Sequence, residues 1–162
     1  MTLMTALSRV LGLVREQVRS YYLGTGMASD AFGIASVLPN LMRRLFAEGA
    51  MTAAFVPVFA DYRKNYSREE LNLFLSRFIT WLSFLVTAVT VVAYAITPWL
   101  VETFFPGFGE DTEKSRLTIE LTRIMWPYLI LVSLAAVVQA VLNSYRIFAP
   151  SAFTPVLLNV VI

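Results

Sequence analysis

Two long runs without a charged residue limit what this chain can fold into. They cover residues 78–101 and 124–145, which is 24 and 22 residues. A membrane-spanning helix needs about 20 predominantly apolar residues. The whole chain is 57% hydrophobic and only 15% charged, whereas soluble domains carry about 25% charged residues. The sequence therefore predicts an all-α, polytopic helical membrane protein.

The pattern of apolar runs, glycines and prolines predicts five helices. Gly24 and Gly26 end the first helix, and Pro39 and Pro57 are expected to bend the long second helix, because proline lacks a backbone N–H. The last helix is still apolar at Ile162, so we expect the protein to continue. Residues 1–162 are interpreted as one N-terminal unit, with about 4.5 transmembrane helices. The expected helices cover about residues 2–23, 28–62, 69–104, 113–146 and 150–162.

Several kinds of chemistry are disfavoured by the composition. The chain contains neither cysteine nor histidine, which removes thiol chemistry, the commonest transition-metal ligands and the usual general base. We therefore expect no enzyme activity, no catalytic residue, no metal site and no cofactor. A net charge of +2 is too small to indicate a nucleic-acid partner. The N-terminus lacks a basic region followed by a cleavage site, so no removable signal peptide is expected.

The distribution of basic residues in the loops predicts the orientation in the membrane. The 61–77 connection contains four Lys or Arg residues, whereas the 102–118 connection contains two beside four acids. Because cytoplasmic loops are enriched in Lys and Arg, residues 61–77 are expected in the cytoplasm and 102–118 outside. The N-terminus would then be cytoplasmic.

The tryptophans are consistent with this placement. Trp81 and Trp99 lie 18 residues apart, which is about 27 Å along a helix and close to the thickness of the hydrocarbon core. Trp126 would return at the outer interface. The alternative is that all three are ordinary core residues.

Arg43 and Arg44 are the most unusual charges in the sequence. They lie within residues 31–60, where the only other ionisable residue is Glu48. A charge in hydrocarbon costs about 2.5–3.5 kcal/mol on insertion scales. The two arginines therefore require a wet cavity, a partner or an anionic ligand. The first helix adds further cations, with Arg15 partway along it.

Two interpretations of these cations remain open. Every cation in the first two helices is an arginine, and a guanidinium can bind phosphate or carboxylate through two parallel hydrogen bonds. An anion site for a group such as a diphosphate is thus favoured. The alternative is internal pairing, because Arg44 and Glu48 are spaced i,i+4. Glu48 could not also neutralise Arg43, which points about 100° away around the helix.

Three further polar residues have local explanations. Asp30 opens the second helix, where the helix dipole favours an acid, but it could also be a partner for the arginines of the first helix. Asn40 follows Pro39 and is interpreted as satisfying backbone groups freed by the kink rather than as a ligand contact. Arg123 is expected to snorkel at the outer end of the fourth helix, without a functional role.

Three segments resemble the N-terminal part of a known family. They are SRVLGLVREQ (8–17), SDAFGIASVLPNLMRRLFAEGAMTAAFVPVFADY (29–62) and PYLILVSLAAVVQAVLNS (127–144). The chain is identified by them as similar to the MurJ (MviN) family, the bacterial lipid II flippases of the multidrug/oligosaccharidyl-lipid/polysaccharide exporter superfamily. The run from Pro39 to Gly49 is the most specific match.

The resemblance implies a function and a site. Family members have 14 transmembrane helices in two lobes around a cationic cavity, alternate between inward-open and outward-open forms, and move undecaprenyl-diphosphate-linked disaccharide-pentapeptide outward across the cytoplasmic (inner) membrane. The implied partners are lipid II, the lipid bilayer and the remaining C-terminal helices. The substrate-binding residues implied for this chain are Arg9, Arg15, Asp30, Arg43, Arg44 and, as a weaker addition, Glu48.

Two other functions are kept as alternatives. A drug or polysaccharide exporter of the same superfamily would use a membrane acid such as Asp30 or Glu48 to exchange protons or sodium. A membrane scaffold would use its charges only to hold helices together.

Overall fold

The described residues of the computed structural model form helices and short connections, with no strand among them. Residues 2–24, 26–106 and 112–148 are described, so the helix expected at 150–162 lies outside them. The all-α prediction is confirmed. The elements are α1 (Thr2–Leu23), α2 (Met27–Arg43), η1 (Arg44–Gly49), α3 (Ala50–Asn65), α4 (Arg68–Phe104), α5 (Thr112–Met125) and α6 (Tyr128–Ser144).

The long second helix of the prediction consists of α2, η1 and α3 in direct succession. Pro39 lies inside α2 and Pro57 inside α3, and neither proline ends its helix. Between them the chain takes the wider π-helical turn of η1. Such π segments are uncommon and are often found at functional sites. The irregularity of this helix therefore coincides with the Arg43–Arg44 pair rather than with either proline.

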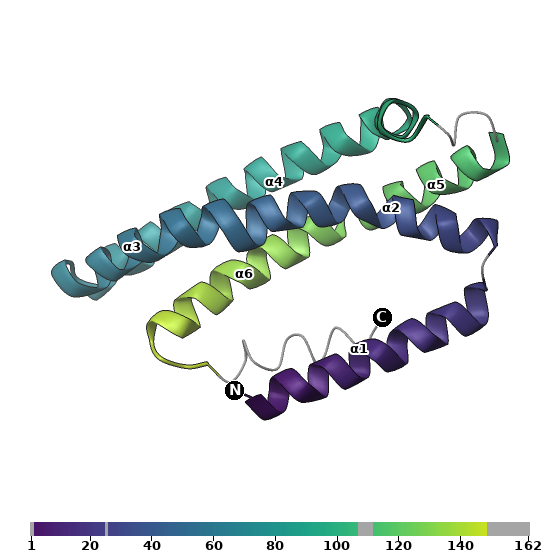
Figure 1. Ribbon diagram of the computed structural model, residues 1–162. Coiled ribbons are helices and arrows are strands. Elements are labelled where there is room, and N and C mark those ends of the chain that lie inside the picture. The colour runs from purple at the N-terminus through teal and green to yellow at the C-terminus, as the bar shows by residue number, and fades with distance from the viewer. Residues whose placement is uncertain (1, 25, 107–111, 149–162) are drawn as a thin grey trace.

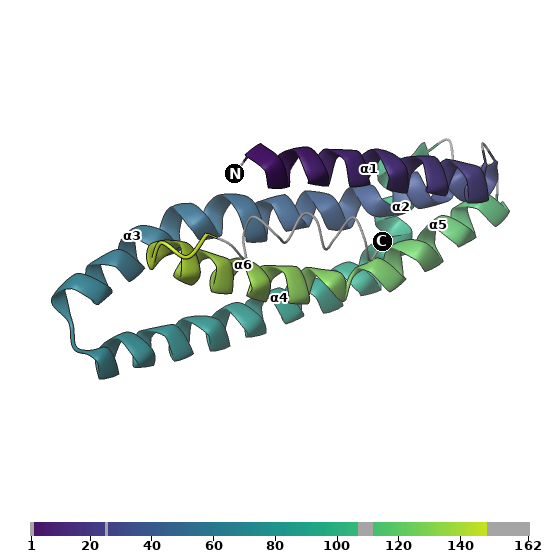
Figure 2. The same ribbon diagram turned by 90° about the horizontal axis from the view of Figure 1, so that it is seen from below.

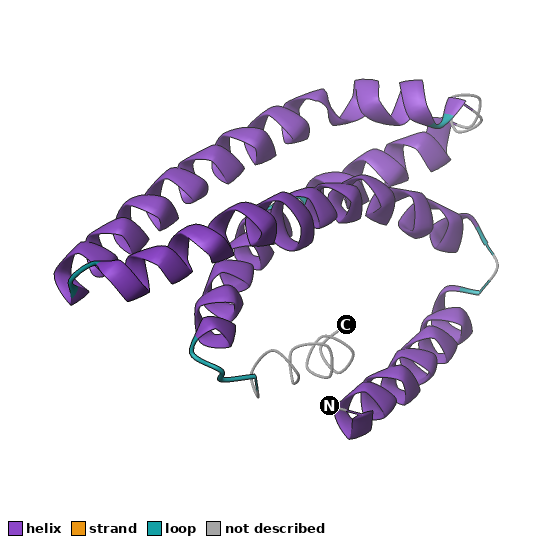
Figure 3. Cartoon of the chain, turned by 60° about the vertical axis from the view of Figure 1, so that its left-hand side comes forward, coloured by secondary structure: helices purple, strands orange, loops and turns teal. Residues whose placement is uncertain are grey.

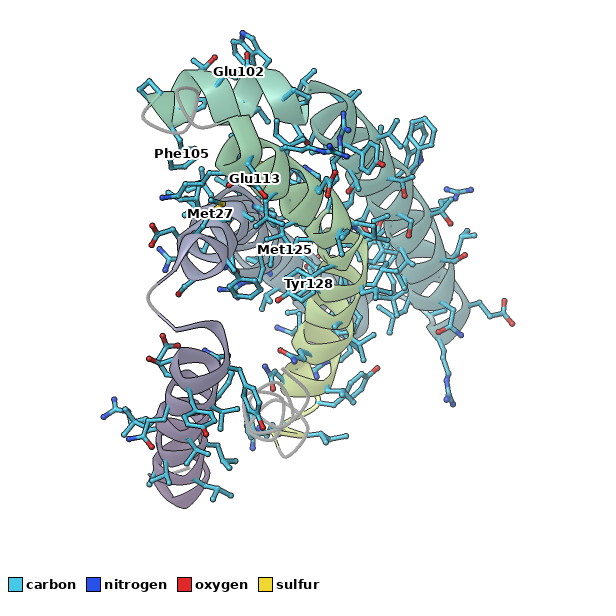
Figure 4. All side chains as sticks on the ribbon, turned by 90° about the vertical axis from the view of Figure 1, so that its right-hand side faces the viewer. Met27, Glu102, Phe105, Glu113, Met125 and Tyr128 are labelled. Atoms are coloured by element: carbon cyan, nitrogen blue, oxygen red, sulfur yellow. The ribbon has the colours of Figure 1, made fainter. Side chains whose placement is uncertain are left out.

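The fourth predicted helix differs from the expectation because it is broken in the middle. Helix α5 ends at Met125 and α6 begins at Tyr128, and these two residues flank the break in Figure 4. Pro127 has no N–H to donate to the carbonyl of Arg123, four residues earlier. The next hydrogen bonds are tighter, from Leu129 N to Trp126 O and from Ile130 N to Pro127 O. Pro127 thus divides the predicted helix 113–146 into the two helices α5 and α6.

Helices α2 to α6 pack side by side, and α1 is set apart from them (Figures 1 and 3). Helix α5 lies against α2 and α4, and α6 lies against α3, α4 and η1. The contact between α2 and α5 is the most extensive, and small residues line it. Ala31 and Ala35 on α2 are buried, as are Thr118 and Thr122 on α5. Side chains of this size let membrane helices approach closely.

Aromatic side chains dominate the core where α3, α4 and α6 meet. The ring centroids of Phe55 and Phe78 are 4.6 Å apart, and those of Tyr62 and Phe74 are 4.4 Å apart. Val137 of α6 closes the cluster. Figure 2 shows this end, where α3 and α4 form a hairpin. Stacked rings on both arms make the hairpin one packed unit.

Two helical stretches are long and apolar enough to cross a membrane, Arg68–Phe104 and Glu113–Ser144. Trp81 and Trp99 of α4 are 72% and 59% exposed, as residues of an interfacial belt would be. Trp126 is only 1% exposed, and its indole Nε1 donates to Thr97 Oγ1 over 2.9 Å. The Trp126 side chain therefore lies in the core, as the alternative had it, and the depth expected for it at the outer interface stays a prediction.

Candidate anion-binding site

Helices α1 and α2, which carry the candidate arginines, are joined by a short connection. Gly24 has φ +60°, a left-handed conformation that glycine adopts without strain. Its N–H donates to Ser20 O over 2.9 Å, which closes the end of α1 in the way typical of helix C-termini. The chain then reverses and starts α2 at Met27. Cations of α1 and α2 therefore lie on the two arms of one hairpin.

Arg43 and Arg44 lie where α2 changes into the π-helical turn. Arg43 is the last residue of α2 and Arg44 the first of η1. The Arg43 side chain is half-buried, and its Nε lies 3.4 Å from Asn40 Oδ1. The Arg44 side chain is exposed. The side-chain contact described for Asn40 is thus with the neighbouring arginine, whereas its predicted role was to satisfy the backbone at Pro39.

The arginines of α1 lie on the other arm of the hairpin. Counted from the turn, Arg15 is about 12 Å and Arg9 about 21 Å along α1, and Arg43 is about 24 Å along α2. Arg9 is exposed and Arg15 half-buried. Neither has an ion-pair partner among the described side chains. Because α1 diverges from α2 (Figure 3), the structure holds these cations on two facing arms rather than in one contiguous cluster.

Asp30 has a different partner from the one expected. Its Oδ2 lies 2.7 Å from the Nζ of Lys114 in α5, with the two side chains 57% and 22% exposed. Met27 and Glu113, which mark the starts of α2 and α5, lie at the same end of the bundle in Figure 4. The ion pair therefore joins α2 to α5, and no arginine of α1 pairs with Asp30 among the described residues. Sequence reasoning missed Lys114, because 84 residues separate it from Asp30.

Two further expectations have different outcomes. The side chain of Glu48 lies outside the described ones, so its expected pairing with Arg44 stays a prediction. Arg123 does not simply snorkel. Its Nε lies 3.4 Å from the backbone oxygen of Tyr94, and its guanidinium lies over the Tyr94 ring. The signal for this contact was present in the sequence as Pro98, which leaves the Tyr94 carbonyl without its helical donor.

Comparison with known proteins finds similar sequences over nearly the whole chain. A sequence model of the family described as lipid II flippase MurJ matches residues 19–162. A probable lipid II flippase MurJ of Treponema pallidum (strain Nichols) is 41% identical, over 99% of this chain and 30% of that protein. The lipid II flippase MurJ of Burkholderia cenocepacia is 38% identical, over 96% of this chain and 30% of that protein.

A solved structure is similar to nearly the whole chain. It is that of lipid II flippase MurJ in an inward closed conformation, with a TM-score of 0.76 and 32% sequence identity. The match covers 95% of this chain and 32% of that one. The chain thus spans about a third of the length of the relatives it matches.

Proposed function

The chain belongs to the MurJ family of lipid II flippases, and on that premise we propose that it forms the N-terminal part of a flippase that moves lipid II from the cytoplasmic to the outer leaflet. The family match over residues 19–162 is the observation that carries the proposal. The helical fold, with two stretches able to cross a membrane, supports it. The protein would act in the bacterial inner membrane as a transporter, without covalent chemistry.

The arginines are the groups proposed to bind the substrate. Arg15 on α1 and the Arg43–Arg44 pair lie on the two arms of the hairpin, and a diphosphate held between the arms is proposed to bind guanidinium groups from both. Each guanidinium can form two parallel hydrogen bonds with phosphate oxygens and keeps its charge away from bulk water. Arg9, Asp30 and Glu48 complete the proposed set. The isoprenoid tail of the lipid would remain in the bilayer.

The rest of the transport cycle is proposed to require the remaining two-thirds of a MurJ protein. Those C-terminal helices would form a second lobe and close the cavity opposite α1 and α2. Rocking of the two lobes would expose the arginines first to the cytoplasm and then to the outside, which is alternating access. The proposed partners are therefore lipid II, the bilayer and the C-terminal helices.

The separation of α1 from α2 is relevant to this cycle. Helix α1 contacts the rest of the described chain mainly through α2, and its apolar residues Leu13 and Val14 are exposed. With so few contacts to α2, α1 can change its angle to that helix at little energetic cost within this part of the protein. We propose that closing and opening of the α1–α2 hairpin around the diphosphate is part of the cycle.

Replacement of single arginines tests the anion site. In the full-length protein, Arg15→Ala and Arg43→Ala should abolish lipid II translocation while membrane levels stay near normal, because the site loses charge and little packing. Arg43→Lys should retain part of the activity, since lysine keeps the charge but lacks the planar fork. Translocation is measured by access of a membrane-impermeant probe to lipid II on the outer face, and protein levels by immunoblotting.

Arg116→Ala is the matched control. Arg116 also lies on a helix of the lobe, but its side chain is 80% exposed and paired with Glu120, so its loss should leave translocation unchanged. Full activity of Arg15→Ala or Arg43→Ala would contradict the diphosphate role. Loss of membrane level in parallel with activity would instead favour the scaffold alternative, in which charges only hold helices together.

The ion-coupled exporter is less well supported. Asp30, one of its two candidate carriers, is already ion-paired with Lys114 at 2.7 Å, so in this structure its carboxylate joins α2 to α5. Protection of the arginine positions from chemical labelling by lipid II, but not by organic cations, would distinguish the flippase from a drug exporter.

A further inference from the structure

Pro98 leaves one backbone carbonyl of a membrane-spanning helix without its helical donor, near the outer end of that helix. It lies within α4, and it has no N–H to donate to the carbonyl of Tyr94, four residues earlier. Tyr94 lies within the uncharged run 78–101. Lipid offers no donor for such a carbonyl, so a partner must come from the protein.

Arg123 of the neighbouring helix supplies a donor at this point. Its Nε lies 3.4 Å from Tyr94 O, and its Cζ lies 5.1 Å from the centroid of the Tyr94 ring. The two residues are 29 apart in sequence and are brought together by the packing of α5 on α4. One guanidinium thus meets both the freed carbonyl and the aromatic face beside it, a combination that its planar shape permits.

The depth of this contact explains why the charge needs it. Tyr94 lies ten residues before the end of α4 at Phe104, and Arg123 lies eleven residues after the start of α5 at Thr112. Both positions are therefore about 15 Å from the outer ends of their helices. Trp99, the expected outer interfacial residue of α4, lies five residues after Tyr94, so the contact lies about 7.5 Å below that level. A partner lowers the cost of an arginine there.

A second polar bridge joins the same turns. Trp126, one turn after Arg123, donates from Nε1 to Thr97 Oγ1, and that hydroxyl donates to Ala93 O over 2.7 Å. The bridge adjoins Pro98 on α4 and Pro127 after α5. A proline thus lies inside α4 and another directly after α5, at the level where polar side chains connect the two helices.

We propose that Arg123 is a positioning residue that replaces the backbone donor missing at Pro98 and so fixes the outer segment of α4 on α5. Without it, the Trp126–Thr97 bridge would be the remaining polar contact described between this part of α4 and the end of α5. The inference concerns the packing of the two helices and does not depend on the identity of the transported lipid.

A double-mutant cycle between Arg123 and Pro98 tests the proposal in the full-length protein. Arg123→Met keeps an apolar side chain of similar length but removes the donor and the charge. Pro98→Ala restores an N–H that can bond to Tyr94 O. We expect Arg123→Met to lower the thermal unfolding midpoint when Pro98 is present, and to have a much smaller effect in the Pro98→Ala background, because the carbonyl then has its own donor.

A distance measurement shows whether the helix itself is affected. Thr87 and Thr103 are exposed positions on α4 on either side of Pro98, and this chain has no cysteine. Spin labels attached through Thr87→Cys and Thr103→Cys should give a narrow distance distribution with Arg123 present. The distribution should broaden in Arg123→Met and become narrow again in Arg123→Met/Pro98→Ala. A role of Arg123 in generic stability would not produce this rescue.

Arg116→Met is the control for loss of an arginine from α5, and it should leave the distribution narrow. Equal broadening by Arg123→Met with and without Pro98 would overturn the proposal, since Arg123 would then act through another group. If Arg123→Met fails to reach the membrane, recovery of its level by Pro98→Ala supports the proposal, and failure of the double variant contradicts it.

Discussion

Arg63 and Arg123 interact with the backbone in the same way at different places in the bundle. The guanidinium of Arg63 in α3 donates to the carbonyl of Ser144, the last residue of α6, and lies 5.3 Å from the centroid of the Tyr145 ring. Arg123 meets the Tyr94 carbonyl and ring. In both cases the arginine donates to a carbonyl of another helix that has no donor within that helix. For Ser144 the reason is the helix end, and for Tyr94 it is the following proline. Arginine content alone therefore cannot separate ligand-binding from structural cations in this chain.

Two buried threonines of α4 differ in their hydrogen bonding, and this difference gives a prediction. Thr97 Oγ1 accepts from the Trp126 indole, whereas Thr90 Oγ1 is buried without a partner among the described residues. Thr97→Val leaves a buried indole N–H unpaired and should destabilise the protein by about 1–3 kcal/mol. Thr90→Val removes an unsatisfied hydroxyl and should be neutral or stabilising.

Both threonine variants replace a hydroxyl by a methyl group of similar size, so packing changes little. Denaturation of the purified protein in detergent, followed by tryptophan fluorescence, gives the comparison. Equal effects of the two substitutions would mean that the Trp126–Thr97 hydrogen bond contributes nothing to stability.

At the scale of the elements, helix ends follow local rules. Ser67 precedes α4, its Oγ accepts from Glu70 N at 3.2 Å, and its own N–H donates to Glu70 Oε2 at 2.9 Å. This reciprocal arrangement satisfies two of the backbone donors that a helix start leaves free. It fixes the start of α4 directly after α3, where the aromatic cluster packs the two helices together.

Removal of this cap should loosen the start of α4. Ser67→Ala is expected to cost about 1 kcal/mol of local stability and to speed amide hydrogen exchange at Glu69 to Leu71. Ser76 is an exposed serine inside the same helix, and Ser76→Ala should be neutral or slightly stabilising because alanine is the better helix former. Unchanged exchange in Ser67→Ala would show that the packing of the aromatic cluster alone holds the helix start.

At the scale of the whole molecule, the helix directions and the loop charges together give a topology. Helices α3 and α4 meet at the basic connection near Asn65, whereas α4 ends and α5 begins at the other end of the bundle (Figure 1). Loops rich in Lys and Arg remain in the cytoplasm. The inner end would then hold the aromatic cluster, and the Asp30–Lys114 pair would lie at the outer end.

Accessibility mapping checks this orientation. A cysteine introduced by Asn65→Cys should react with a membrane-impermeant maleimide only after the cells are opened, whereas Gly109→Cys should react in intact cells. Arg68→Cys, at the start of α4 and three residues after Asn65, provides an internal control for the cytoplasmic side. The reverse labelling pattern would overturn the orientation, and with it the proposed direction of access to Arg43 and Arg44.

The sequence by itself determined the class of the protein and the bounds of most helices. Uncharged runs, the glycines at 24 and 26 and the Ser67 cap act over a few residues, so they can be identified without a fold. The expected ranges 2–23 and 69–104 agree closely with α1 and α4. Arg43 and Arg44 are consecutive in the sequence, so their closeness needs no tertiary structure. The resemblance to the MurJ family is confirmed by the match of the family model.

Only the tertiary structure decided which polar groups meet. The partners Asp30 and Lys114 are 84 residues apart in sequence. Arg123 and Tyr94 are 29 residues apart, as are Trp126 and Thr97. Helical periodicity describes one helix, and it says nothing about which helix packs on which face. The burial of Trp126 and the divergence of α1 from α2 depend on that packing for the same reason. The chain's arginines could therefore be found from sequence, but their partners became visible only once the helices were assembled.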